Sequence, residues 1–220
     1  MEHLLLRLPC ILIGCGSAKQ KLCKHIFAIA LALHYICSDM EKVQEIKKTF
    51  YAYRNGIIAD RLRNAGDCHA VIFGLNIPQI VNIANELGQD THLARQLWNN
   101  SNSRESRMLA PMLFPCDELG YDEACLWIED VENVEIADNL CHKLLRKVDS
   151  AEKLFQKYAN ADKDLLRYVA FRLAMNLLCI GAVADRVAML DAARREVAKG
   201  CGMTQNVARD VVEEIELMQG

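Results

Sequence analysis

Hydrophobic residues recur every three or four positions along most of the chain, a spacing typical of amphipathic α-helices that bury one face. The clearest example is Val134–Lys147. Its apolar stripe runs on past the last residue of that stretch and comprises Val134, Ala137, Cys141, Leu144, Leu145 and Val148. Asp138 falls at the edge of the stripe, one turn after Val134. Acidic side chains are rarely buried without a partner, so Asp138 is expected either to be paired across a helix interface or to line a cleft.

The same periodicity, bounded by capping residues, glycines and prolines, predicts about ten helices joined by short loops. Asn76, Ser103 and Ser150 are the expected N-caps, and either Asp90 or Thr91 caps a further helix. No convincing strand is found. The predicted helices are Glu41–Tyr53 with a continuation over Ile57–Arg63, a helix between Asn76 and Gly88, one through Trp98, then Arg104–Leu113, Tyr121–Glu129, the Asp138 helix, Ala151–Asn160, Leu165–Ile180, Ala184–Lys199 and Gln205–Met218. Helices in successive antiparallel pairs indicate an all-α fold, either an α-solenoid or an irregular bundle.

The composition supports an ordered helical protein. Hydrophobic residues make up 52% of the chain, and only 4 prolines and 11 glycines occur. Ten cysteines without regular spacing do not indicate a disulfide framework, and several lie on apolar helix faces, as small buried side chains do. No Cys-x-x-Cys pair occurs, so we expect no metal site and no cofactor.

The net charge of −3 conceals an uneven distribution of charge. Residues 40–138 hold 9 Lys and Arg against 16 Asp and Glu, whereas residues 139–200 hold 12 against 7 and are net +5. A basic block of this kind is either a surface for an anionic ligand or a solvated helix face.

The first 39 residues differ from the rest of the chain. Two short apolar runs, Leu4–Gly14 and Ile26–Cys37, are both too short to span a membrane. Three interpretations compete: a secretory signal, since Leu12–Cys15 resembles a lipoprotein cleavage box, an N-terminal helical hairpin, or an upstream start with Met40 as the true first residue. We favour the third and expect Met1–Asp39 to be an atypical extension and residues 40–220 to form one domain.

Several motifs in order resemble the DNA alkylation repair family of HEAT-like-repeat alkylpurine glycosylases. They are Ile72–Ile80, Leu93–Trp98, Arg104–Ala110, Trp127 and Val134–Leu145, and the similarity covers about Glu41–Ile180. The resemblance implies an α-α superhelix of HEAT-like helix pairs, an ARM-repeat-like solenoid, whose basic concave face grips duplex DNA. Trp98 and Glu105 within these motifs are interpreted as determinants of the fold.

The resemblance also implies roles for individual residues. Asp138 matches the family's catalytic carboxylate, although Val134 stands where the family has a tryptophan, and Val211–Ile215 lacks a second expected aromatic residue. Arg167 matches a phosphate-binding arginine, and a shift of one residue would put Tyr168 in that position. The further candidates for DNA contact are Lys143, Arg146, Lys147 and Arg172, and Trp127 is a candidate for stacking on the lesion.

Two functions from different classes follow. The first is a DNA glycosylase that excises N3- and N7-alkylated purines from duplex DNA, with Asp138 stabilising an oxocarbenium-like transition state. The alternative is a catalytically inactive HEAT-like-repeat protein that binds DNA or a protein partner on its concave face. In either case we expect a cytoplasmic monomer that does not enter a membrane, and His142 is interpreted as a hydrogen-bonded surface histidine.

Overall fold

The computed structural model describes residues 41–218, so the expectation for Met1–Asp39 lies outside the described range. The chain divides into two compact units, Met1–Ile46 and Lys47–Gly220. The described part of the first unit is helical, and the helix over residues 41–52 crosses the boundary. The second unit is treated by itself below.

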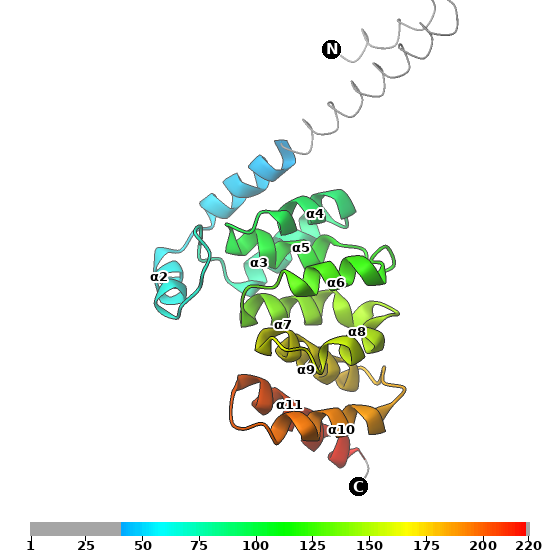
Figure 1. Ribbon diagram of the computed structural model, residues 1–220. Coiled ribbons are helices and arrows are strands. Elements are labelled where there is room, and N and C mark those ends of the chain that lie inside the picture. Colours follow the sequence, from blue (N-terminus) through cyan, green and yellow to red (C-terminus); the bar gives the residue numbers. More distant parts are fainter. Residues whose placement is uncertain (1–40, 219–220) are drawn as a thin grey trace, which may run out of the picture. The chain divides into compact units, whose positions relative to one another are not determined.

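The second unit is built from helices (Figure 1). Their bounds are α2 Gly56–Asn64, α3 Ile77–Leu87, α4 Thr91–Asn99, α5 Arg104–Leu113, α6 Tyr121–Glu129, α7 Val134–Lys143, α8 Ala151–Tyr158, α9 Asp164–Cys179, α10 Arg186–Val197 and α11 Met203–Leu217, with a 3₁₀ turn, η2, at Leu145–Lys147. Among the described residues the β-structure is one isolated bridge between Val71 and Ser103. The all-α prediction is confirmed.

The helices form two layers. In one layer α3, α5, α7, α9 and α11 pack successively on one another, and in the other α4, α8 and α10 pack on α5, α9 and α11, while α6 packs on α8 and α9. This is the helix-pair arrangement of HEAT-like repeats. Among the described residues, no helix combines the length and the apolar character that crossing a membrane requires.

Local signals explain where most helices start. Asn76 and Gln79 form a reciprocal capping box at α3, Asp90 caps α4, and the Ser103 hydroxyl accepts from Ser106 N at α5. Ser150 occupies the N-cap of α8, but its side chain makes no capping hydrogen bond. That predicted cap is therefore correct in position and wrong in its bonding.

The structure interrupts two of the predicted helical runs. The first helix and α2 are separate, because Asn55 adopts an extended conformation and its side chain accepts from Ile57 N and Ile58 N, which caps a new helix. The Asp138 helix ends at Lys143, since Leu144 leaves the helical region at φ −122° and ψ −65°. The chain continues as η2, and its Leu145 remains buried.

A buried polar network at α5 attaches the connector between α2 and α3 to the helical layers. Glu105 is fully buried, and its carboxylate accepts from the backbone N–H groups of Phe73, Gly74 and Leu75. Gly74 sits at φ +81°, and a Cβ there would lie 2.2 Å from the Asn55 carbonyl oxygen, so only glycine fits. Glu105 thus has the structural role that the sequence predicted.

Arg104 and Arg107 continue this network. Arg104 is buried and pairs with Glu105 and Glu135. Burial works against its charge, but the two carboxylates outweigh burial and raise the pKa of Arg104. Arg107 lies over the ring of Trp98 and pairs with Asp130 and Glu132.

Candidate functional site

Asp138 projects from α7 at the boundary between its buried and exposed faces. Asn133 caps the helix by accepting from Ile136 N at 2.9 Å, and the next turns bury Ala137 and Cys141. The side chain of Asp138 is 36% exposed. The carboxylate is therefore open to solvent on one side while its helix is held rigidly in the core.

One oxygen of this carboxylate is fixed by two groups from α9. Tyr168 donates its hydroxyl hydrogen to Oδ1 at 2.8 Å, and Nε of Arg172 lies 2.9 Å from the same oxygen as an ion pair without a directed hydrogen bond. Burial raises the pKa of Tyr168 well above its ordinary value, and the Asp138 carboxylate is the second-largest cause of the rise. Tyr168 therefore remains a protonated donor at physiological pH.

The second oxygen, Oδ2, makes no hydrogen bond or ion pair with any residue that the structure describes. A carboxylate with one oxygen fixed and the other oxygen unpaired at a half-exposed position can face a positively charged ligand without moving. The Tyr168 and Arg172 contacts supply the positioning for that role.

His142 lies one turn beyond Asp138 and faces the same interface between α7 and α9. Its Nδ1 lies 3.2 Å from Oδ1 of Asn176, which can only accept, so Nδ1 is the protonated nitrogen. Burial lowers the pKa of His142, and the nearby cations Arg146, Lys143 and Arg172 lower it further. His142 is exposed and hydrogen-bonded, as the sequence analysis interpreted it.

The two predicted DNA-binding lysines are the last residues of α7 (Lys143) and of η2 (Lys147). Lys143 and Lys147 line a hollow of ≈ 320 Å³ together with side chains from α3, α5 and the turn after α3; the other lining residues are Val81, Ala84, Asn85, Gly88, Gln89 and Met112. Lys143 is half-buried and Lys147 is exposed. Arg146 is half-buried in η2 between them.

Arg167 is occupied by contacts within the protein. Its Nε donates to the buried carboxylate of Glu196, its Nη1 to the carbonyl oxygens of Ala161 and Asp162, and its Nη2 to Asp164. The side chain is 13% exposed. These contacts connect α9 with α10, so we do not include Arg167 among the proposed phosphate contacts, and Arg172 is the α9 arginine beside Asp138.

Trp127 lies in the core rather than at a surface. It is 4% exposed and stacks on Trp98, with ring centroids 4.4 Å apart and an interplanar angle of 7°. Phe114 packs edge-on against the same ring. This corrects the expectation that Trp127 stacks on a damaged base, because reaching one would require the core to open.

Asn176 is a member of the site that the sequence analysis missed. It accepts from His142 and donates to the Arg172 carbonyl oxygen at 2.8 Å. Asn176 therefore links His142 to Arg172 across the interface between α7 and α9. The sequence spacing could have identified Asn176, because Tyr168, Arg172 and Asn176 follow one another at intervals of four residues and so share one face of a helix.

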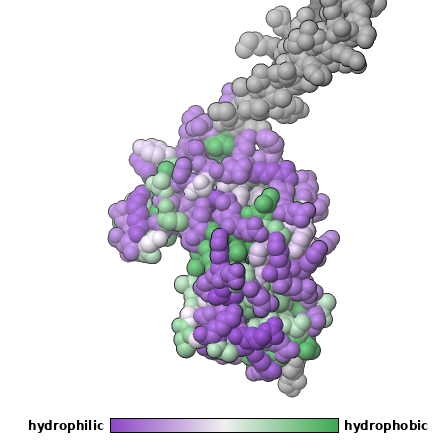
Figure 2. Space-filling view, in the orientation of Figure 1, coloured by the Kyte–Doolittle hydropathy of each residue, from purple (hydrophilic) through white to green (hydrophobic). Residues whose placement is uncertain are grey.

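The molecular face in Figure 2 is largely hydrophilic and carries only smaller hydrophobic patches. Large contiguous apolar patches mark surfaces for stable protein partners. The visible face therefore gives no particular support to a protein partner over a polar ligand.

Comparison with known proteins places the chain among DNA repair proteins. The family model for "DNA alkylation repair enzyme" matches residues 46–205. A solved structure described as "a new family of proteins related to the HEAT-like repeat DNA glycosylases with affinity for branched DNA structures" is 13% identical, with a TM-score of 0.69 over 78% of this chain and 74% of that chain.

No curated protein matches the sequence. The structural similarity establishes that the fold is that of the HEAT-like-repeat DNA glycosylases and their relatives. The family model covers well over half of the chain. On this evidence, the protein belongs to the DNA alkylation repair enzyme family.

Proposed function

We propose that the protein is a DNA glycosylase that releases N3- and N7-alkylated purines from duplex DNA. The observation that carries the proposal is the geometry of Asp138, whose Oδ1 is fixed by Tyr168 and Arg172 while Oδ2 is left unpaired at a half-exposed position. The family supports a role in alkylation repair.

The chemistry suits a fixed carboxylate. Alkylation at N3 or N7 makes the purine cationic, so the glycosidic electrons leave readily with the base and positive charge develops at C1′. Oδ2 of Asp138 stabilises that charge and orients a water molecule, whose oxygen bonds to C1′ while its proton passes to solvent. The products are the free alkylpurine and an abasic site.

DNA binding would use cations on the same layer of helices. The Arg172 side chain is 37% exposed, so its guanidinium can contact a phosphate while its Nε holds Asp138. Lys143 and Lys147 line the hollow toward α3, and Arg146 lies between them in the chain. These side chains would fix the position of the duplex without reading its sequence.

The decisive test is release of methylated purine from alkylated duplex DNA. We expect the full chain to release 3-methyladenine or 7-methylguanine well above the spontaneous rate, measured by chromatography of the free base. Release at the spontaneous rate, from protein that binds the same duplex, would contradict the glycosylase proposal.

A second candidate is recognition of branched DNA without base excision. Two observations favour it: the Arg172 cation offsets the charge of Asp138, and Tyr168 is only 5% exposed, so its ring cannot stack on a nucleotide. The similar solved structure is described as having affinity for branched DNA. Tighter binding to a four-way junction than to a duplex, together with absence of base release, would select this function.

DNA binding should fall steeply with salt, since each neutralised phosphate releases counterions. The log–log slope of affinity against salt is about −0.9 per phosphate contact, so replacing both Lys143 and Lys147 by Ala should make the slope less steep by about 2. Lys153→Ala on α8 is the matched control, because Lys153 lies over the Tyr121 ring in the other layer. Fluorescence anisotropy at several salt concentrations measures the slope, and an equal change in the double variant and in Lys153→Ala would exclude the hollow as a phosphate site.

A further inference from the structure

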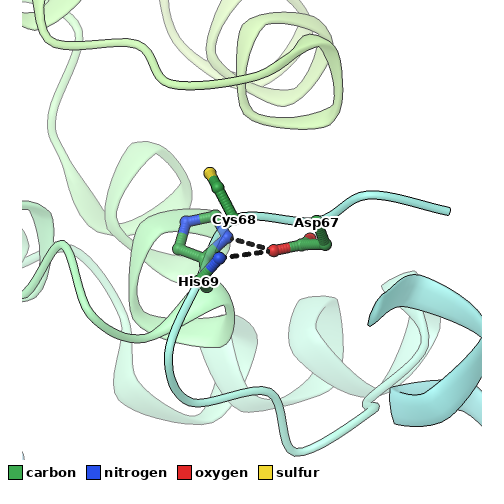
Figure 3. A group of neighbouring side chains, drawn as sticks. All are labelled: Asp67, Cys68 and His69. Carbon is green, nitrogen blue, oxygen red and sulfur yellow. Dashed lines mark hydrogen bonds and ion pairs between the residues drawn. The ribbon is translucent and has the colours of Figure 1, made fainter. Parts of the chain in front are cut away.

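The connector between α2 and α3 carries three consecutive side chains of the kinds that bind metals. One ligand atom each from Asp67, Cys68 and His69 lies within 4.8 Å of the others (Figure 3). The side chain of His69 is 1% exposed, whereas Cys68 is exposed. The connector therefore places a buried imidazole next to a solvent-accessible thiol.

The ring of His69 is held by Asp67. Oδ1 of Asp67 accepts from the His69 backbone N–H at 2.9 Å and lies 2.6 Å from its ring Nδ1; the dashed lines in Figure 3 mark both contacts. A carboxylate that accepts from Nδ1 leaves Nε2 as the nitrogen with an available lone pair. Metal-binding histidines commonly have this arrangement, in which a carboxylate holds the ring nitrogen that faces away from the metal.

A second carboxylate faces that lone pair. Oε2 of Glu132 lies 3.5 Å from Nε2 of His69, and both atoms are buried without a hydrogen-bond partner among the described residues. The other oxygen, Oε1, lies 2.9 Å from Nη2 of Arg107, which fixes the direction of the carboxylate. A lone pair and a carboxylate oxygen repel each other unless a proton or a metal ion lies between them.

The separation of these atoms suits a zinc-type ion. At Zn–N and Zn–O distances of about 2.0–2.2 Å, two ligands of a tetrahedral ion are about 3.4 Å apart. Cys68 offers a third ligand, because its Sγ lies within 4.8 Å of a His69 ring nitrogen. Imidazole, thiolate and carboxylate together favour zinc over magnesium or calcium.

The electrostatic surroundings favour an added cation. Five carboxylates interact in this cluster with two guanidinium groups, and the cluster comprises Asp67, Glu105, Asp130, Glu132, Glu135, Arg104 and Arg107. Asp67 and Glu105 carry their charges at buried positions, where negative charge in excess over positive charge is costly. A divalent ion would offset this excess.

We propose that Cys68, His69 and Glu132 bind one zinc-type divalent cation, with Asp67 orienting His69. The exposure of Cys68 leaves a fourth position for water. The ion would join the α2–α3 connector to the α6–α7 connector, two segments far apart in sequence. Binding would thus stabilise the folded unit, since the unfolded chain does not hold these ligands together.

The test uses the full chain, stripped with a chelator and titrated with Zn²⁺ alone. We expect one equivalent to bind and the melting midpoint to rise by about 5–10 °C at a hundredfold excess over the dissociation constant. Cys68→Ser and Glu132→Gln should each lose most of that rise. Cys179→Ser, which removes an exposed thiol elsewhere, should keep it.

Cobalt(II) gives an independent readout that does not depend on stability. The wild type and Cys179→Ser should show a thiolate-to-cobalt charge-transfer band with tetrahedral visible bands, and Cys68→Ser should lose the charge-transfer band. A spectrum and melting shift that persist in both Cys68→Ser and Glu132→Gln would overturn the proposal. So would a wild type that binds no equivalent of Zn²⁺.

Discussion

Replacing Asp138 by Asn should lower release of alkylated purine by about 10²–10³-fold, the loss typical of one preorganised electrostatic group. The substitution keeps the shape of the side chain and its bond with the Tyr168 hydroxyl, but it removes the negative charge that faces C1′. Single-turnover release of 7-methylguanine from alkylated duplex measures the effect. Binding to undamaged duplex should be unchanged or slightly tighter, because a negative charge near the phosphates is lost.

The control for this variant is Asp191→Asn, an exposed aspartate on α10. It should release base at the wild-type rate. Asp138→Asn should also melt close to the wild type, because the carboxylate and Arg172 are both partly solvated and surface ion pairs contribute little. Wild-type release by folded Asp138→Asn would exclude the Asp138 carboxylate from catalysis.

Replacing Glu105 by Gln should produce the largest loss of stability among the substitutions considered. The carboxylate is fully buried and accepts from three backbone N–H groups of the connector while it faces Arg104. The glutamine amide replaces one acceptor oxygen by an NH₂ group, which cannot accept from the Phe73 N–H. It also removes a negative charge that pairs with the Arg104 guanidinium. Breaking a buried pair of this kind costs ~3–5 kcal/mol.

For a domain of this size such a loss lowers the melting midpoint by roughly 6–20 °C. Differential scanning calorimetry measures it, with Glu86→Gln on the exposed side of α3 as the matched control, expected within about 1–2 °C of the wild type. A midpoint for Glu105→Gln within that same range would show that the connector is held by its apolar contacts instead.

Much of the fold could be predicted from local signals. Periodicity and capping residues such as Asn76, Asp90 and Ser103 specify helices because their hydrogen bonds form within a few residues of chain. The motif Arg104–Arg107 indicated a structural role for Glu105, and the structure confirms it. Periodicity failed at Leu144, where apolar spacing continues although the backbone leaves the α-helix.

The amino-acid sequence by itself determined the all-helical class, the helix positions and the rim position of Asp138, since each depends on neighbours along one helix. Only the tertiary structure decided what Asp138, Arg167 and Trp127 contact. Arg167 and Arg172 lie on the same helix and look equivalent in sequence, yet one faces Glu196 of α10 and the other faces Asp138 of α7. The pairing of His69 with Glu132 likewise depends on connectors that meet only after the helices have packed, so no local spacing could reveal it.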